Sequence, residues 1–352
     1  MSEQPPTVAA PKGFDRRKGV LLVCVVLLAI GVWRIAGRSA GVGAGTEVLP
    51  EVVSPPNASA DEVMVGAFVN QIHEFSLRDN SFTVDFYLWF RWKNPNLKPY
   101  ETFSVIDGRI ENRTEAVVRE LPGGERHAYT RVVAKITRFF DISDYPLDNH
   151  QLAIIVEEED SESQKVRYVA DTTNSAASPT ILLPGWVFER LSSEAGVGTY
   201  HSNFGDPTLP TGNSASYARL TTAVTFTRVG ANFFIKLFFG LWACVLLSIL
   251  AFFMRPVNVD PRFGVGVGAL FGAIASQYVV ANALPDSNVI TLADQMHLVA
   301  FLFIITSVTQ STVSLWLWET DRQVASHRLD VWFRIGMPVA YVIATALLIH
   351  SS

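Results

Sequence analysis

The residues of this chain best suited to chemistry are closely spaced carboxylates. Residues 157–164 read EEEDSESQ, with five acidic side chains in eight positions. Carboxylates at this spacing raise one another's pKa, and hard cations prefer oxygen ligands. The run therefore predicts either a sensor of protons or divalent cations or, as for most charge runs, a solvated turn.

A second stretch, DISDYPLDNHQL at residues 141–152, places apolar residues where water would be expected. The flanking sequences RVVAKITRFF and HQLAIIVEE are typical of strands, so the stretch is a loop between two strands. Its apolar tip, Tyr145-Pro146-Leu147, lies between aspartates. In an isolated soluble domain this tip would sit in water, so we expect it to contact another part of the molecule.

Motifs for other kinds of site chemistry are not found in the sequence. Cys24 and Cys244 both lie in apolar runs and predict neither a disulfide nor a metal site. No Ser-His-Asp, HExxH, phosphate-loop or paired-carboxylate motif is present in the outer part, and the seven histidines are scattered. We expect no enzyme activity, no metal site and no cofactor.

The composition is that of a membrane protein. Of 352 residues, 49% are hydrophobic and 17% charged, and the mean hydropathy is +0.24. Residues 41–228 carry 25 acidic and 16 basic side chains, a net charge of −9. Such a domain would gather cations near a membrane and repel anions, which argues against nucleic-acid binding.

Four apolar runs are each close to the ~20 residues that span a bilayer as a helix. The first and third links between them contain arginines, whereas the second contains no Lys or Arg. The positive-inside rule then puts the first and third links in the cytoplasm, and the preceding domain and the C-terminus outside. The predicted spans are about 233–254, 263–284, 295–318 and 332–350.

The N-terminal residues 1–40 contain a shorter apolar run after Arg16, Arg17 and Lys18. This pattern fits a cytoplasmic tail followed either by a cleaved signal peptide or by an uncleaved anchor, and both would export the next domain. Residues 41–61, rich in Gly, Ala, Pro and Ser, predict a flexible linker.

Residues 62–228 predict strand after strand, with no helical period. FTVDFYLWFRW and ARLTTAVTFTRV alternate like strands, and a Pro-Gly-Gly turn joins two more. We expect an immunoglobulin-like β-sandwich of about ten strands, joined almost without a linker to a four-helix transmembrane domain at 229–352. Movement of the sandwich would then be transmitted to the helices.

Four motifs in this order resemble those of the pentameric ligand-gated ion channels, the Cys-loop receptor superfamily. They are FYLWFRWKNP, DISDYPLDNHQL, TFTRVGANFF and NALPDSNVITLADQ, and the resemblance runs from about residue 63 to the C-terminus. Phe140 and Leu152 lie near the positions of the loop cysteines, as in the prokaryotic type that lacks them. The resemblance implies that the tip of this loop rests on the outer ends of the helices, and that Pro146 is cis.

The resemblance further implies a homopentameric channel in the cell membrane, its β-domain in the bacterial periplasm. It would pass inorganic cations and be gated by a small extracellular ligand, protons or a divalent cation. The alternative is a non-conducting, membrane-anchored sensor. The glycine-rich second span, with Gly264, Gly266, Gly268 and Gly272, is the best support for that alternative, because a packed bundle tolerates glycine.

In this family the second span lines the pore. Helical steps of three and four from Gly264, matched at Pro285, select one face. Phe271 would close the pore by dewetting, Tyr278 would form a second constriction, and a ring of Asp260 would favour cations. Without the resemblance, ordinary helix packing would be the preferred explanation of Phe271 and Tyr278, and a solvated turn or helix cap would equally explain Asp260. The predicted pore-lining residues are Asp260, Gly264, Gly268, Phe271, Ala275, Tyr278 and Asn282.

Coupling between sandwich and helices should depend on charge. Arg228 matches the family's junction arginine, and Asp148 and Asp79 match its acidic partners, although Asp79 equally fits a turn-former. The predicted coupling residues are Asp79, Tyr145, Pro146, Asp148, Arg228, Pro285 and Asp286.

The ligand site is the least specified. The family binds its ligand under a hairpin, here NFGDPTLPTGNSASY, which offers Tyr200, Phe204 and Tyr217. The opposing run at 157–164 has no aromatic residue, which disfavours a simple amine held by ring faces. Glu158 and Asp160 are the acidic candidates there.

Overall fold

A computed structural model of the chain describes residues 60–202, 204–205 and 215–350. The predicted tail and signal or anchor at 1–40 and nearly all of the linker at 41–61 lie outside the described residues. The tip of the predicted ligand hairpin, at 206–214, does too.

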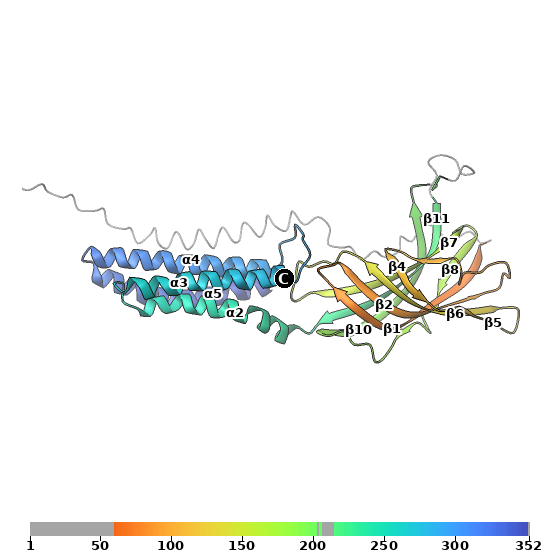
Figure 1. The fold of residues 1–352 in the computed structure, drawn as a ribbon, viewed down its shortest axis with the longest axis horizontal. Helices are drawn as coiled ribbons and strands as arrows, with labels where there is room; N and C mark the ends of the chain where they lie inside the picture. Colours follow the sequence, from red (N-terminus) through yellow and green to blue (C-terminus); the bar gives the residue numbers. More distant parts are fainter. Residues whose placement is uncertain (1–59, 203, 206–214, 351–352) are drawn as a thin grey trace, which may run out of the picture. The chain divides into compact units, whose positions relative to one another are not determined.

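The outer domain is a sandwich of two sheets, as the strand patterns predict (Figure 1). One sheet has the order β4-β6-β2-β1-β8, with β5 paired to β6 and β9 to β1, and the other has the order β10-β11-β7-β3. The described residues form eleven strands, one more than expected. They are β1 (Asp61–Ser76), β2 (Ser81–Trp92), β3 (Phe103–Val105), β4 (Gly108–Arg113), β5 (Val117–Glu120), β6 (Arg126–Thr137), β7 (Asn149–Glu162), β8 (Val166–Ala170), β9 (Ala176–Ala177), β10 (Trp186–Tyr200) and β11 (Ala215–Arg228).

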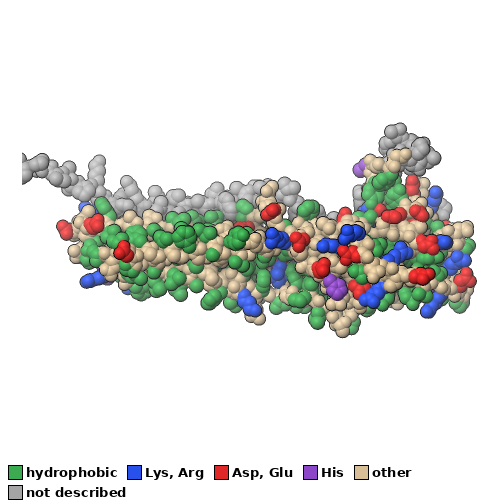
Figure 2. Space-filling view, in the orientation of Figure 1, with side chains coloured by type: hydrophobic (Ala, Val, Ile, Leu, Met, Phe, Trp, Pro, Cys, Tyr) green, Lys and Arg blue, Asp and Glu red, His purple; other side chains and the backbone are tan. Residues whose placement is uncertain are grey.

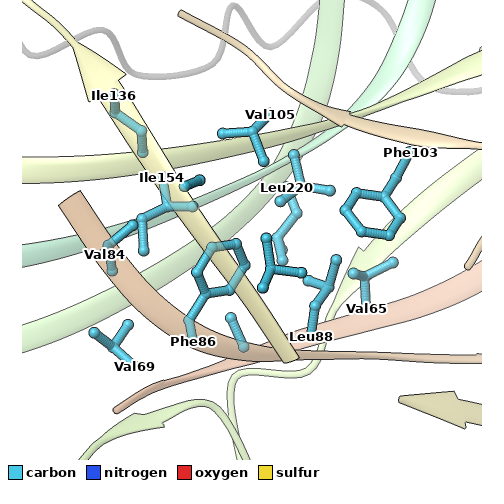
Figure 3. Packing of buried hydrophobic residues seen from close by; sticks show 14 of the residues in the cluster. Val65, Val69, Val84, Phe86, Leu88, Phe103, Val105, Ile136, Ile154 and Leu220 are labelled. Atoms are coloured by element: carbon cyan, nitrogen blue, oxygen red, sulfur yellow. The ribbon is translucent and has the colours of Figure 1, made fainter. Parts of the chain in front are cut away.

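Alternation along the strands builds the core between the sheets. In β2 every second residue from Phe82 to Trp92 is at most 2% exposed, and Val84, Phe86 and Leu88 have no exposed surface. These side chains meet Ile154 of β7 and Leu220 of β11, which come from the opposite sheet (Figure 3). Burying each such side chain contributes roughly 1.5–3 kcal/mol. The sandwich is therefore a well-packed scaffold that can hold its loops in position.

Four helices long and apolar enough to cross a membrane follow the sandwich. They are α2 (Gly230–Leu250), α3 (Val259–Ala281), α4 (Leu292–Glu319) and α5 (Gln323–His350), with a short turn η1 (Ala251–Phe253) after α2. On the visible face of the helices, hydrophobic side chains are plentiful and charged ones lie mainly toward the ends, while charged side chains gather over the strands (Figure 2). The predicted fold class is confirmed, and the chain is that of a multi-pass membrane protein.

The helix ends differ from the prediction in a consistent way. α3 begins four residues before position 263, and α5 begins nine residues before position 332. Both extensions contain charged residues, which an apolar window leaves out although a helix can continue beyond the hydrocarbon layer. Between β11 and α2 the linker is a single residue, Val229, so the strand and the helix are joined tightly.

Candidate functional site

The apolar loop between β6 and β7 contacts the helices. The carbonyl oxygens of Ser143 and Tyr145 accept hydrogen bonds from the backbone N–H groups of Leu292, at 2.8 Å, and Ala293, at 3.1 Å. Both donors belong to the first turn of α4, where N–H groups have no partner within the helix. The loop therefore completes the hydrogen bonding of this helix end.

The tip itself is covered. Tyr145 is 3% exposed, and its ring centre lies 6.2 Å from that of Phe233 in α2. The Tyr145–Pro146 peptide bond is cis, as the resemblance implied. The apolar residues at this loop tip are thus explained by contact with α2 and α4.

Beside the tip lies a buried ion pair. Nε and an Nη of Arg228 donate to the two carboxylate oxygens of Asp148 at 2.7 and 3.1 Å. The side chains are 10% and 2% exposed. Burial alone would raise the pKa of Asp148, but hydrogen bonds from His150 and Arg228 outweigh burial and hold the pKa below its usual value. The structure brings these two predicted coupling residues together.

Aromatic rings surround the Arg228 guanidinium. Its central carbon lies 4.1 Å from the ring centre of Trp186, 4.9 Å from that of Phe233 and 5.1 Å from that of Tyr145. These rings come from β10, α2 and the loop, so a single cation holds three segments together. Neither Trp186 nor His150 was expected from the sequence, where a lone Trp at a strand start and a His within a strand carry no particular signal.

The other predicted acidic partner has a different role. Asp79, in the turn between β1 and β2, accepts a hydrogen bond from Ser76 at 2.8 Å, whereas Arg228 is paired with Asp148. Its neighbour Arg78 donates to the backbone oxygen of Asn282, at the end of α3, at 3.3 Å. The turn thus meets α3 through Arg78. Pro285 and Asp286 follow in the link to α4, half-buried and exposed, respectively.

All the predicted pore-lining residues are exposed: Asn282 is the C-cap of α3, and the others lie within the helix. Phe271 is 68% and Tyr278 70% exposed, whereas Ala269 and Ala273 are buried in the bundle. Asp260 lies within the first turn of α3, and the N-cap is Asn258, so the aspartate is not the helix cap.

The glycines of α3 divide into two kinds. A side chain on Gly266 would meet Val308 of α4 at 2.7 Å, and one on Gly272 would meet Cys244 of α2 at 2.6 Å. Gly264 and Gly268 would meet nothing within 4 Å. Gly266 and Gly272 therefore permit close packing within the bundle. Gly264 and Gly268 leave the exposed face of α3 without side chains at those two positions.

At the other end of α3 a buried polar cluster joins three helices. Arg262 donates to both oxygens of Asp330 in α5, at 2.6 and 3.0 Å, and Gln310 of α4 donates to the same carboxylate at 2.7 Å. The Arg262 side chain has no exposed surface. In the sequence Arg262 counted only as a loop charge, and its partner 68 residues away gave no signal.

The predicted ligand aromatics lie together. Tyr200, Phe204 and Tyr217 have ring centres 5.3 to 6.5 Å apart. Arg219 lies over the Tyr200 ring, with its guanidinium carbon 5.3 Å from the ring centre, and donates to Tyr200 Oη at 2.8 Å and to Glu157. The chain's own cation therefore already contacts this aromatic group.

The acidic residues 157–160 lie on β7, and neighbouring side chains there contact different partners. Glu157 accepts from Tyr200 at 2.7 Å, while Glu158 faces Tyr168, whose hydroxyl donates to it at 3.1 Å. Burial raises the pKa of Glu158 above its ordinary value. Glu158 thus lies apart from the aromatic group, and Asp160 is exposed at the end of the buried stretch. Within the described part of the chain, no three His, Cys, Asp or Glu side chains are grouped as metal ligands.

Comparison with known proteins gives no assignment. No model of a known protein family matches the chain, and no curated protein sequence is significantly similar to it. The layout, a β-sheet domain followed by four apolar helices, is compatible with that of the pentameric ligand-gated channels.

Proposed function

We propose that the chain is one subunit of a homopentameric, cation-selective channel in the cell membrane. An extracellular ligand or protons would move the β-sandwich, and the junction around Asp148 and Arg228 would pass this movement to α3. The sandwich would face the periplasm. A non-conducting membrane sensor is the rival function.

The exposed face of α3 supports the proposal most strongly. From Trp332 onward the exposed positions of α5 are mostly large apolar side chains such as Ile335, Val339 and Val342, which suit lipid. The exposed positions of α3 include apolar residues such as Val267, Ile274 and Val279, but they also include Asp260, Asn282, glycine, alanine and two aromatic residues. Polar groups and glycines are poor contacts for lipid tails but suit water and neighbouring copies of the same helix.

The contacts at the outer end of the bundle supply the coupling. The β6–β7 loop bonds to α4, Arg228 leads into α2, and Arg78 reaches the end of α3. The ligand in this proposal is unidentified. The aromatic group at Tyr200 is its best place, and Arg219 on that ring further disfavours a simple amine.

The subunit number tests the assembly. Native mass measurement of the protein in mild detergent and in lipid nanodiscs should give five copies. A monomer or dimer in both would leave α3 without a pore to line and would favour the sensor. Potassium efflux from proteoliposomes, screened over pH, then tests conduction.

A further inference from the structure

His150, at the start of β7, also binds the Asp148 carboxylate that pairs with Arg228. The His150 side chain is 4% exposed, and its Nε2 lies 2.6 Å from Oδ2 of Asp148. An ionised carboxylate only accepts hydrogen bonds, so the imidazole nitrogen is the donor. In the described contacts, Oδ2 of Asp148 therefore accepts hydrogen bonds from both His150 and Arg228, while Oδ1 accepts one from Arg228 alone.

The rest of the imidazole faces aromatic rings. The ring centres of Phe140 and Trp186 lie 5.2 Å from that of His150, and the ring centre of Phe75 lies 5.9 Å away. These rings come from the β6–β7 loop, β10 and β1. In the described contacts, the charged groups that face this cluster are Asp148 and Arg228, and the Tyr145 hydroxyl is the other titratable group. With a neutral imidazole the charges of Asp148 and Arg228 cancel.

We propose that His150 is a positioning residue of this junction, which orients Asp148 toward Arg228 and weakens their pairing when it takes up a proton. This assignment rests on the proposed function for its consequence in gating. A protonated imidazole makes its hydrogen bond to Oδ2 charge-assisted and places a second cation beside Arg228. The two cations then compete for one carboxylate in a site with little water, where like charges repel strongly.

The position of Arg228 in the chain determines the consequence. It is the last residue of β11, and α2 begins two residues later. Weaker pairing of Arg228 would loosen the sandwich from the first membrane helix. Acid should therefore loosen this junction, and neutral pH should tighten it.

Tryptophan fluorescence of the full-length protein in detergent tests the titration, because Trp186 contacts both His150 and Arg228 and a protonated imidazole quenches indole emission. From about pH 8 to 5 the wild type should lose intensity in a sigmoidal step. His150→Gln keeps a donor for Asp148 but does not titrate, so it should lack the step, as should Trp186→Phe. His201→Gln, an exposed histidine beyond the far end of β10, is the matched control and should retain the step. An unchanged step in His150→Gln would overturn the assignment.

Thermal unfolding tests the positioning role. At neutral pH, His150→Phe keeps an aromatic ring but lacks the hydrogen-bond donor for Asp148. It should unfold at a lower temperature than His150→Gln. Equal midpoints for the two variants would contradict the role.

Potassium efflux from proteoliposomes supplies the functional result. The pH dependence of efflux should be reduced in His150→Gln and retained in His201→Gln. If no variant conducts at any pH, the channel proposal fails, while the fluorescence step still decides whether His150 titrates at this junction.

Discussion

Neutralising Asp148 should destabilise the protein far more than neutralising an exposed carboxylate. In Asp148→Asn the Arg228 cation stays buried among three rings with its counter-charge removed. Breaking a buried pair on one side costs about 3–5 kcal/mol, because the remaining charge is not neutralised. We expect the upper half of this range at neutral pH, since the carboxylate is only 2% exposed and also binds His150.

The stability lost in Asp148→Asn should depend on pH with a defined sign. The folded-state pKa of Asp148 is lowered, so its contribution to stability is complete above the unfolded-state pKa of about 3.9 and is lost as pH falls through the folded value. The difference between wild type and Asp148→Asn should therefore be full at about pH 7 and shrink below about pH 4.

The assay is unfolding of the full-length protein in detergent, with a double-mutant cycle. Asp148→Asn, Arg228→Gln and the double variant should show a coupling of about 1–3 kcal/mol. Glu101→Gln is the matched control, because Glu101 pairs with Lys98 at side-chain exposures of 52% and 58% and should cost less than about 1 kcal/mol. The reasoning would be refuted if Asp148→Asn lowered the free energy of unfolding no more than Glu101→Gln does. It would also be refuted if the losses in Asp148→Asn and Arg228→Gln simply added in the double variant.

Three other predictions test separate parts of the account. Gly272→Ala should lower the unfolding temperature because its new methyl group meets Cys244 at 2.6 Å, at a cost of about 1–3 kcal/mol. Gly268→Ala meets nothing within 4 Å and should not lower it, because alanine favours a helix more than glycine does. Glu158→Gln should raise the unfolding temperature at about pH 7 but not at about pH 4; burial raises the folded-state pKa of this group, so its ionisation costs stability as pH rises above about 4.5, and equal gains at both pH values would contradict this. Phe271→Ala should increase potassium efflux from proteoliposomes, and unchanged or lower efflux would argue against a gate at that ring.

Periodicity and run length in the sequence were enough to predict the sandwich and the four helices, and the apolar tip of the β6–β7 loop predicted a contact with another part of the molecule. That this part is the helices was expected through the family resemblance. Apolar alternation and run length are local properties, and an apolar loop tip needs a cover wherever that cover lies. Pairing across long separations was less accessible. Arg262 and Asp330 meet only because α3 and α5 are rotated so that both side chains point inward, and this rotation is set by packing in three dimensions.

The coupling residues show the same limit. Arg228 and Asp148 were expected through the family resemblance, and they pair. Asp79 was expected there too, but its turn holds it against Ser76, and Arg78 makes the contact with α3. A choice between two adjacent side chains depends on the exact turn geometry, which a sequence pattern does not specify.

Thiol accessibility along α3 tests the central claim most directly. In a background with Cys24→Ser and Cys244→Ala, single cysteines at positions 264–282 of the reconstituted protein would be treated with a small, charged, water-soluble thiol reagent. The account predicts reaction at Gly268, Ala275 and Asn282 and protection at Ala269 and Ala273, in agreement with the exposed and buried faces of the helix. If Gly268 and Ala275 are as unreactive as Ala269 and Ala273, α3 borders no water within the membrane and the channel proposal is wrong.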